Sequence, residues 1–187
     1  MILLIFAALG FLIGLVTGGS VHGLSRYALK GILLPVAALL LKSGAAALLA
    51  PQTGAVAVCL LQYALLFVFL LLNARRPVWP IVVFFGSFLN MLVIVLNGGC
   101  MPVSVTLLGG AGGRLVQIAQ GRIYAYCLLN ETTKLPFLGD VIRVGPAGMP
   151  IGFASAGDIL LGVGVAILAY QMTRADCKHE RSETPVL

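Results

Sequence analysis

Charge is scarce in this 187-residue chain: 10% of its residues are charged, whereas 60% are hydrophobic. Soluble domains carry roughly a quarter charged residues, because water must wet their surface. The mean hydropathy of +1.06 also excludes a disordered chain, since disorder requires low hydrophobicity. The sequence therefore predicts an integral membrane protein.

Acidic residues are the scarcer charged type: six Asp and Glu stand against twelve Lys and Arg, for a formal net charge of +6. The basic residues stand singly or in pairs between apolar runs, which is typical of topology signals and headgroup contacts. We therefore expect membrane lipids as partners and no nucleic acid. Cys-x-x-Cys motifs and Cys/His clusters are missing, so the sequence predicts no metal and no cofactor. It leaves the oligomeric state open.

Five apolar segments approach the length of about 20 residues that a membrane-spanning helix needs. They are residues 2–17, 32–50, 55–73, 78–97 and 153–172. The long connection at 98–152 has helical apolar spacing over 114–129, which predicts a short interfacial helix, and otherwise indicates ordered loop or short strands. The predicted fold is an all-α integral membrane domain over residues 1–172, followed by a flexible polar tail at 173–187.

Basic residues in the short connections predict the orientation. The connections at 18–31 and 74–77 carry two basic residues each, and the tail carries three more. By the positive-inside rule these segments are cytoplasmic. The N-terminus and the 98–152 connection then lie outside, and the C-terminus lies inside.

Polar side chains within the predicted helices form a layer at one depth. Lys42, Gln62, Asn90 and Asp158 each lie five to eight residues below the outer end of their helix. At 1.5 Å per residue this is roughly 7–12 Å below the outer surface. Asn97 follows Asn90 by two helical turns on the same face. We expect a shared binding site that opens outward.

Other interpretations of the polar layer stay open. Polar side chains also join helices by hydrogen bonds, which would explain Gln62 and Asn90. Lys42 could form a buried ion pair with Asp158, extend toward the headgroups or contact an anionic lipid.

Two carboxylates favour a chemical role for this layer. Asp140 and Asp158 both follow glycine, both precede apolar residues, and are 18 residues apart. Carboxylates brought close share a proton, which is the chemistry of aspartic peptidases. The first hypothesis is an outward-facing hydrolase using both acids, with Asn90 orienting one. The alternatives are a protein that binds or translocates a lipid or small amphiphile, and a non-catalytic subunit of a membrane complex.

Two cysteines of the long connection offer a second local prediction. Cys100 and Cys127 both fall outside, where disulfides persist. A bridge between them would tie the start of the connection to its predicted helix. The sequence leaves open whether this bridge forms.

Three motifs of the chain resemble an uncharacterised bacterial membrane family, catalogued as a domain of unknown function with the number 5317. They are Asn-Gly-Gly-Cys-Met-Pro-Val at 97–103, Leu-Pro-Phe-Leu-Gly-Asp-Val-Ile at 135–142 and Ser-Ala-Gly-Asp at 155–158. The resemblance implies a multi-pass protein of the bacterial cell membrane and no particular activity.

Three shorter stretches are similar to lipoprotein signal peptidase, a small aspartic peptidase. They are Gly-Ser-Phe-Leu-Asn at 86–90, Asp-Val-Ile at 140–142 and Phe-Ala-Ser-Ala-Gly-Asp at 153–158. This resemblance implies a catalytic pair of Asp140 and Asp158 with Asn90 nearby. The chain departs from the family pattern at Ala154 or Ser155, where an Asn is expected, and lacks an Asp-Arg pair after Asn90.

Overall fold

Five apolar helices make up the body of the protein. The computed structural model describes residues 2–50, 52–104, 112–145 and 152–175. The helices are α1 (Ile2–Val16), α3 (Leu33–Leu48), α4 (Ala55–Leu72), α5 (Trp79–Leu96) and α7 (Ala156–Thr173). Within the described residues, α4, α5 and α7 are long and apolar enough to cross a membrane, whereas α1 and α3 are shorter. The expected helices are therefore present, but the count of five spans is not supported.

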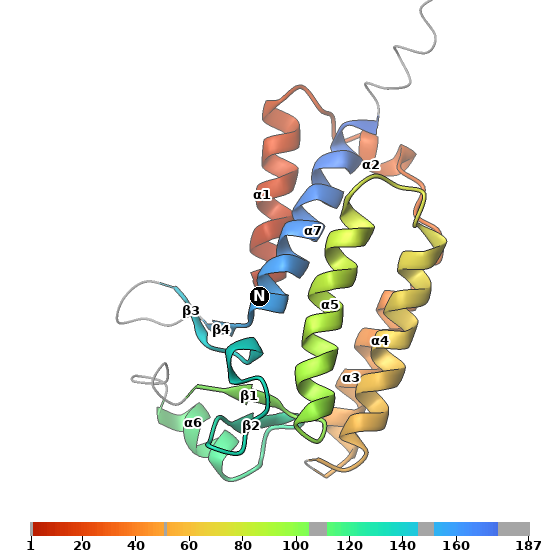
Figure 1. Ribbon diagram of the computed structural model, residues 1–187. Coiled ribbons are helices and arrows are strands. Elements are labelled where there is room, and N and C mark those ends of the chain that lie inside the picture. Colours follow the sequence, from red (N-terminus) through yellow and green to blue (C-terminus); the bar gives the residue numbers. More distant parts are fainter. Residues whose placement is uncertain (1, 51, 105–111, 146–151, 176–187) are drawn as a thin grey trace, which may run out of the picture.

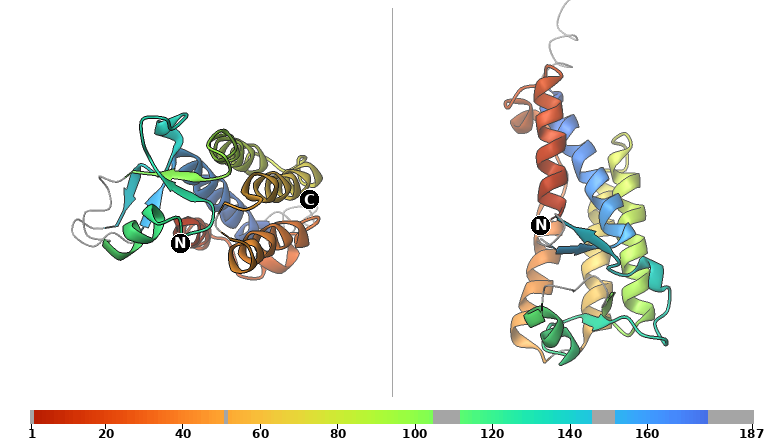
Figure 2. Two further views of the ribbon diagram at one scale, coloured as in Figure 1. Left: turned by 90° about the horizontal axis from the view of Figure 1, so that it is seen from below. Right: turned by 90° about the vertical axis from the view of Figure 1, so that its left-hand side faces the viewer.

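The helices pack in the spatial order α1, α7, α5, α4 and α3, as Figure 1 shows. The views of Figure 2 show that α1 is set toward one end of the bundle and α3 toward the other. Glycines allow the closest approaches. A Cβ at Gly86 of α5 would lie 2.6 Å from the backbone nitrogen of Leu161 in α7, and one at Gly10 of α1 would collide with the Ala166 carbonyl. Small residues let membrane helices pack this closely.

Buried polar contacts hold one end of the bundle together. The Asn73 amide, at the end of α4, bonds the backbone of Lys30 through both its oxygen and its nitrogen. The Trp79 indole donates to the Tyr27 hydroxyl, which donates to Gln171 of α7. These contacts join the residues that follow the short helix α2 (Gly23–Arg26) to the end of α4, the start of α5 and the last turn of α7.

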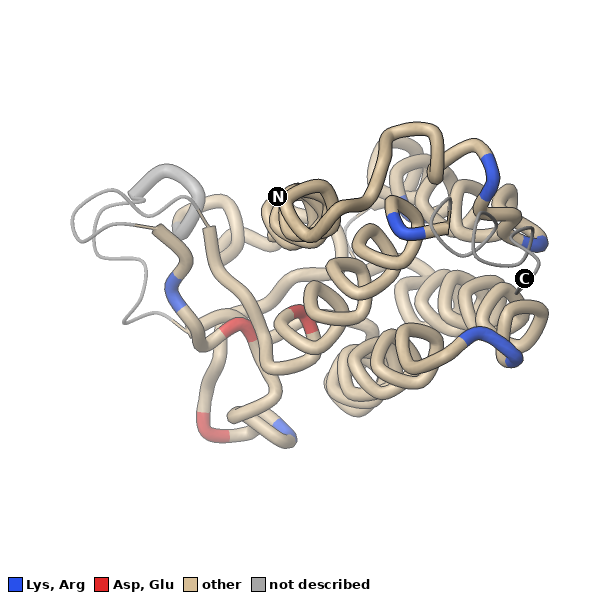
Figure 3. The backbone as a smooth tube through the Cα atoms, turned by 90° about the horizontal axis from the view of Figure 1, so that it is seen from above, with Lys and Arg blue, Asp and Glu red and all other residues tan. Residues whose placement is uncertain are grey.

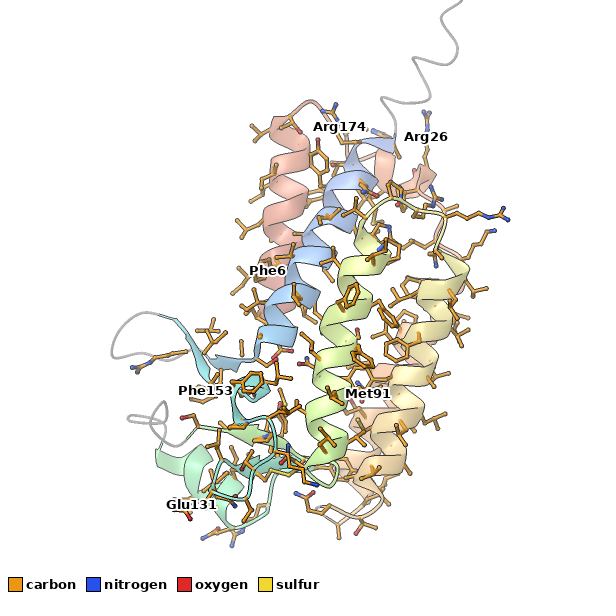
Figure 4. The ribbon with its side chains drawn as sticks, in the orientation of Figure 1. Phe6, Arg26, Met91, Glu131, Phe153 and Arg174 are labelled. Atoms are coloured by element: carbon orange, nitrogen blue, oxygen red, sulfur yellow. A yellow bond between two sulfur atoms is a disulfide. The ribbon has the colours of Figure 1, made fainter. Side chains whose placement is uncertain are left out.

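The described acidic residues lie toward one end of the bundle. Figure 3 shows one group of Lys and Arg residues apart from the Asp and Glu residues, and other Lys and Arg residues near these acids. Figure 4 places Arg26 and Arg174 at one end and Glu131 at the other. We call these the basic end and the acidic end.

The connection between α5 and α7 forms a small substructure at the acidic end. Strand β1 (Met101–Val103) pairs in parallel with β2 (Tyr126–Leu128), and β3 (Ile142–Val144) pairs antiparallel with β4 (Gly152–Ala154). A disulfide joins Cys100 to Cys127 across the first pair. The bridge that the sequence left open is therefore present.

The helix of this connection is shorter than predicted. Helix α6 covers Gly112–Ala119, not residues 114–129. It ends at Ala119, and Gly121 follows two residues later with a φ of +64°. The Gly121 N–H donates to the Ile118 carbonyl at 2.9 Å and the Arg122 N–H to the Gln117 carbonyl at 2.8 Å. This Schellman pattern terminates a helix, and the residues beyond it are free to form β2.

The substructure docks on the turn between α3 and α4. The Tyr124 hydroxyl donates to the Thr53 carbonyl at 3.2 Å, and the Gln52 amide donates to the Tyr126 carbonyl at 3.2 Å. The one-turn 3₁₀ helix η2 (Pro136–Leu138) crosses toward α5 and α7. These contacts cover the space between the helices at the acidic end.

Candidate functional site

One cavity brings together most of the predicted site residues. It has a volume of about 460 Å³ and lies among α3, α4, α5, α7 and the strands β1 and β2. The predicted residues that line it are Lys42, Gln62, Asn90, Asp140 and Asp158. An adjoining cavity of about 400 Å³ shares Lys42, Asp140 and Asp158 with it. Phe153, which lines the adjoining cavity, lies on β4 just before α7 (Figure 4).

Asp158 is held at the start of α7 by a capping box. The Ser155 hydroxyl accepts the Asp158 N–H at 3.0 Å, and the Asp158 carboxylate accepts the Ser155 N–H at 3.1 Å through Oδ2. This exchange satisfies two backbone donors that have no partner within the helix. Ser155 was not among the predicted site residues, although Ser-x-x-Asp before an apolar run is the pattern of a capping box.

Asn90 connects this cap to α5. Its Nδ2 donates to Asp158 Oδ1 at 2.8 Å, and its Oδ1 accepts the Ser155 hydroxyl at 2.8 Å. Asn90 is 5% exposed and Ser155 is fully buried. Gly157 makes room, because a Cβ there would collide with Asn90 Oδ1. The three polar side chains form a closed network, which we call the Asn90 network, that fixes the orientation of the Asp158 carboxylate.

Asp140 reaches the cavity from the other direction. Its N–H donates to the Pro102 carbonyl at 2.8 Å, and its carbonyl accepts the Ser104 N–H at 3.2 Å, so it runs parallel beside β1. Gly139 precedes it because a Cβ at that position would lie 2.6 Å from the Pro102 carbonyl oxygen. The loop thus folds Asp140 back toward the start of α7. The side chain is 6% exposed.

Lys42 and Gln62 complete the polar end of the cavity from α3 and α4. Both are partly buried. Within the part of the chain that the structure describes, no ion pair joins Lys42 to Asp158, so one of the three interpretations of Lys42 is not realised. No hydrogen bond of the Gln62 side chain is present among these residues either, so the structure gives no support to helix joining by Gln62.

Asn97 stands apart from the cavity. Helix α5 ends at Leu96, and Asn97 is its C-cap. The Asn97 amide donates to the carbonyls of Val93 and Lys134 and accepts the Lys134 N–H at 2.9 Å. Its role in the structure is to fasten the loop to α5. Asn97 was expected in the site from its spacing of two turns from Asn90, but its amide is bound to this backbone and it does not line the cavity.

Three tyrosines in the cavity wall were not predicted. Tyr63 of α4 and Tyr124, which precedes β2, are each 7% exposed, and Tyr126 of β2 is partly buried. Tyr63 follows Gln62 directly, but an aromatic residue in an apolar helix gives no separate signal. Across the described ranges, no group of three or more His, Cys, Asp or Glu residues could hold a metal ion.

The sequence model of a family of unknown function (DUF5317) matches residues 24–170. The chain belongs to this family. The family assignment made from three motifs is confirmed, and the match covers every cavity-lining polar residue of the DUF5317 protein. No curated protein and no solved structure matches the chain, so nothing supports the resemblance to lipoprotein signal peptidase.

Proposed function

We propose that this DUF5317 protein is a membrane hydrolase of the aspartyl type, in which Asp140 and Asp158 activate water at the polar end of the cavity. The observation that supports it best is that these carboxylates, 18 residues apart in sequence, line the same two cavities. Of the acidic residues that the structure describes, the third, Glu131, is exposed. Lys42 supplies positive charge beside the pair.

The proposed reaction is the hydrolysis of an ester or amide. One carboxylate takes a proton from water, and the water oxygen bonds to the carbonyl carbon. The other acid, protonated at the start, gives its proton to the leaving oxygen or nitrogen as the bond to that carbon breaks. One aspartate has then gained a proton from water and the other has given a proton to the leaving group, and the products are a carboxylic acid and an alcohol or amine. Asn90 acts as a positioning residue through Asp158.

The proposal includes an orientation in the bacterial cell membrane. The acidic end lies outside and the basic end in the cytoplasm, in line with the positive-inside rule. We propose that α1 and α3 also cross, although their helical lengths of about 23 and 24 Å are shorter than a hydrocarbon core of about 30 Å. Local thinning of the bilayer accommodates such short helices at modest cost.

Heavy-oxygen water gives a test that requires no knowledge of the substrate. The purified protein is reconstituted with a total bacterial membrane extract in labelled water, and products are followed by mass spectrometry. Each hydrolysis places one labelled oxygen in its product. We expect labelled acids with the wild type and at least a hundredfold fewer with Asp140→Asn or Asp158→Asn, as for loss of a general acid or base.

Glu131→Gln is the matched control, because it removes an exposed acid of the same connection. It should hydrolyse like the wild type. The hydrolase proposal would be refuted if either aspartate variant formed as much labelled product as the wild type. It would also be refuted if the wild type formed no more labelled product than empty vesicles.

A second candidate function is non-catalytic binding or translocation of a lipid or small amphiphile. It is favoured by the Asn90 network, in which each Asp158 oxygen already accepts a structural hydrogen bond. In that case the wild type and the three variants should release no labelled acid but should retain the same lipid through purification. Mass spectrometry of the intact proteins distinguishes this outcome from hydrolysis.

A further inference from the structure

The cavity is elongated along the helices. On α4 it is lined by residues that recur every three or four positions on one face: Ala55, Val58, Cys59, Gln62, Tyr63, Leu66 and Phe69. From Ala55 to Phe69 this face extends about 21 Å at 1.5 Å per residue. Half of a bilayer core is about 15 Å thick. The cavity is therefore long enough for an extended hydrocarbon chain.

The two ends of the cavity differ in chemistry. On three helices the lining farther toward the basic end is apolar: Phe69 comes seven residues after Gln62, Val83 seven before Asn90, and Leu168 ten after Asp158. Toward the acidic end the lining is mixed, because Ala55, Val58 and Ile94 line the cavity beside the polar residues. Helix α5 runs opposite to α4 and α7, so these three apolar positions fall at the same end. Trp79, Leu29 and Ile32 line the cavity there as well. Such a division matches a molecule with a polar head and an apolar tail.

One side of the cavity is closed by α1 and α3, which do not pack closely on each other. Lining residues come from α1 (Leu3) and from α3 (Pro35, Lys42). Of the described helices, α4 is the one against which α3 packs closely, whereas α1 packs on α7. On α3, Leu39 and Leu40 are 63% and 66% exposed. The boundary between α3 and the α1–α7 pair is therefore the side on which side chains alone separate the cavity from lipid.

We infer that the substrate is a single-chain amphiphile with an anionic headgroup, which enters from the bilayer between α3 and the α1–α7 pair. Its chain lies along the α4 face and its headgroup meets Lys42, the cation in the cavity wall. The inference rests on the proposed function only in treating the bound molecule as the substrate. Its carbonyl would then lie at the polar end, beside the two carboxylates.

A built-in reporter makes the binding measurable. Trp79 is the single tryptophan of the chain, it is 1% exposed, and it lines the apolar end of the cavity. The probe is lysophosphatidylglycerol brominated near the end of its chain, added to the full-length protein in phosphatidylcholine nanodiscs. Bromine quenches tryptophan only at close range. We expect saturable quenching of Trp79 by this probe and several-fold weaker quenching by the same lipid brominated near its headgroup.

Variants separate the headgroup contact from the chain contact. Lys42→Met should weaken binding about tenfold or more, because a charge-assisted contact is lost. Lys134→Met is its control, since Lys134 is exposed on the outer connection. Leu168→Phe narrows the apolar end and should weaken binding of a long chain more than of a short one. Leu71→Phe, at a position that is 74% exposed, is the matched control.

The outcomes are distinct. Equal quenching by the two brominated positions, equal binding by Lys42→Met and the wild type, or no quenching at all would overturn the inference. Brominated diacyl phosphatidylglycerol that quenches as well as the single-chain probe would also overturn it. Binding without labelled hydrolysis products would refute the proposed function alone, and labelled products without this binding would refute the substrate class alone.

Discussion

Two buried asparagines, one at each end of the helix bundle, differ in the groups that they bind. Asn73 at the basic end is 3% exposed, and its amide contacts backbone: it donates to the carbonyls of Lys30 and Phe69 and accepts the Lys30 N–H. Asn90 is 5% exposed, and its amide contacts the side chains of Ser155 and Asp158. One asparagine therefore joins chain segments, whereas the other orients an ionisable group.

The surroundings of the two asparagines differ in the same way. Near Asn73 the polar side chains are paired: Arg76 lies 4.5 Å from the centre of the Tyr27 ring and donates to the Ala28 carbonyl. Asn90 itself lines the cavity, with Lys42 and Gln62 on the same wall, whereas Asn73 is not among the lining residues. Burial alone does not distinguish a structural polar residue from one at a site. The distinction lies in whether the hydrogen-bond partners are backbone or ionisable side chains, and in whether the residue lines a cavity. Variants at the two ends of the bundle test it.

Removing the disulfide should have the largest effect on stability, and this effect should originate at the acidic end. The double variant Cys100→Ser, Cys127→Ser opens a loop with a sequence separation of 27. Chain entropy predicts a loss of about 3.5 kcal/mol in the free energy of unfolding for a loop of this size. Because β1 positions Asp140, hydrolysis should fall, while the native Trp79 emission at the basic end stays unchanged.

Denaturant unfolding measures the loss of stability in the double cysteine variant, and the heavy-oxygen assay measures its loss of hydrolysis. A shift of the Trp79 emission in the native variant would contradict the separation of the two ends.

Asn73→Ala should cost less stability and leave the site intact. It removes three hydrogen bonds to backbone, each contributing about 1 kcal/mol, so the free energy of unfolding should fall by about 2–3 kcal/mol. Hydrolysis per folded molecule should not change, because no cavity-lining carboxylate is touched. Thermal unfolding and the heavy-oxygen assay at a temperature below the transition check both parts. Reduced turnover in the folded protein would count against a purely structural role.

Asn90→Ala should lower stability less than Asn73→Ala and should lower turnover more. It removes two side-chain hydrogen bonds and should lower the free energy of unfolding by about 1–2 kcal/mol. Turnover should fall at least tenfold, because Asp158 loses the donor that orients its Oδ1. Asn90→Gln, which keeps the amide one methylene farther out, should restore part of the turnover. Equal turnover in Asn90→Ala and Asn73→Ala would remove the basis for treating the two asparagines differently.

Much of the helical framework could be predicted from sequence because it depends on local apolar composition. The predicted segments 55–73 and 78–97 agree with α4 and α5 to within one residue at each end. The shared depth of Lys42, Gln62, Asn90 and Asp158 also anticipated a common cavity, since helices of known rise convert spacing into depth.

The parts that could not be predicted depend on contacts between distant residues. Strands β1 and β2 have three residues each and form because pairing and a disulfide bring residues 101 and 126 together. The burial of Asp140 depends on its contact with Pro102, which no local pattern encodes. Asn97 does not line the cavity because its amide bonds the backbone of Lys134, which is 37 residues away in the sequence.

Gly44→Ala should have the smallest effect on stability, and it should raise stability instead of lowering it. Gly44 lies within α3, and nothing lies within 4 Å of a Cβ placed there. Replacing a helical glycine in open space should raise the free energy of unfolding by about 0.5–1 kcal/mol, because alanine loses less backbone freedom on folding. The same change at Gly157 places its Cβ against Asn90 Oδ1 and should destabilise the protein and lower turnover. Thermal unfolding of the two variants side by side measures the difference. If Gly157→Ala were as stable and active as Gly44→Ala, the Asn90 network would not be the rigid support for Asp158 that its geometry indicates.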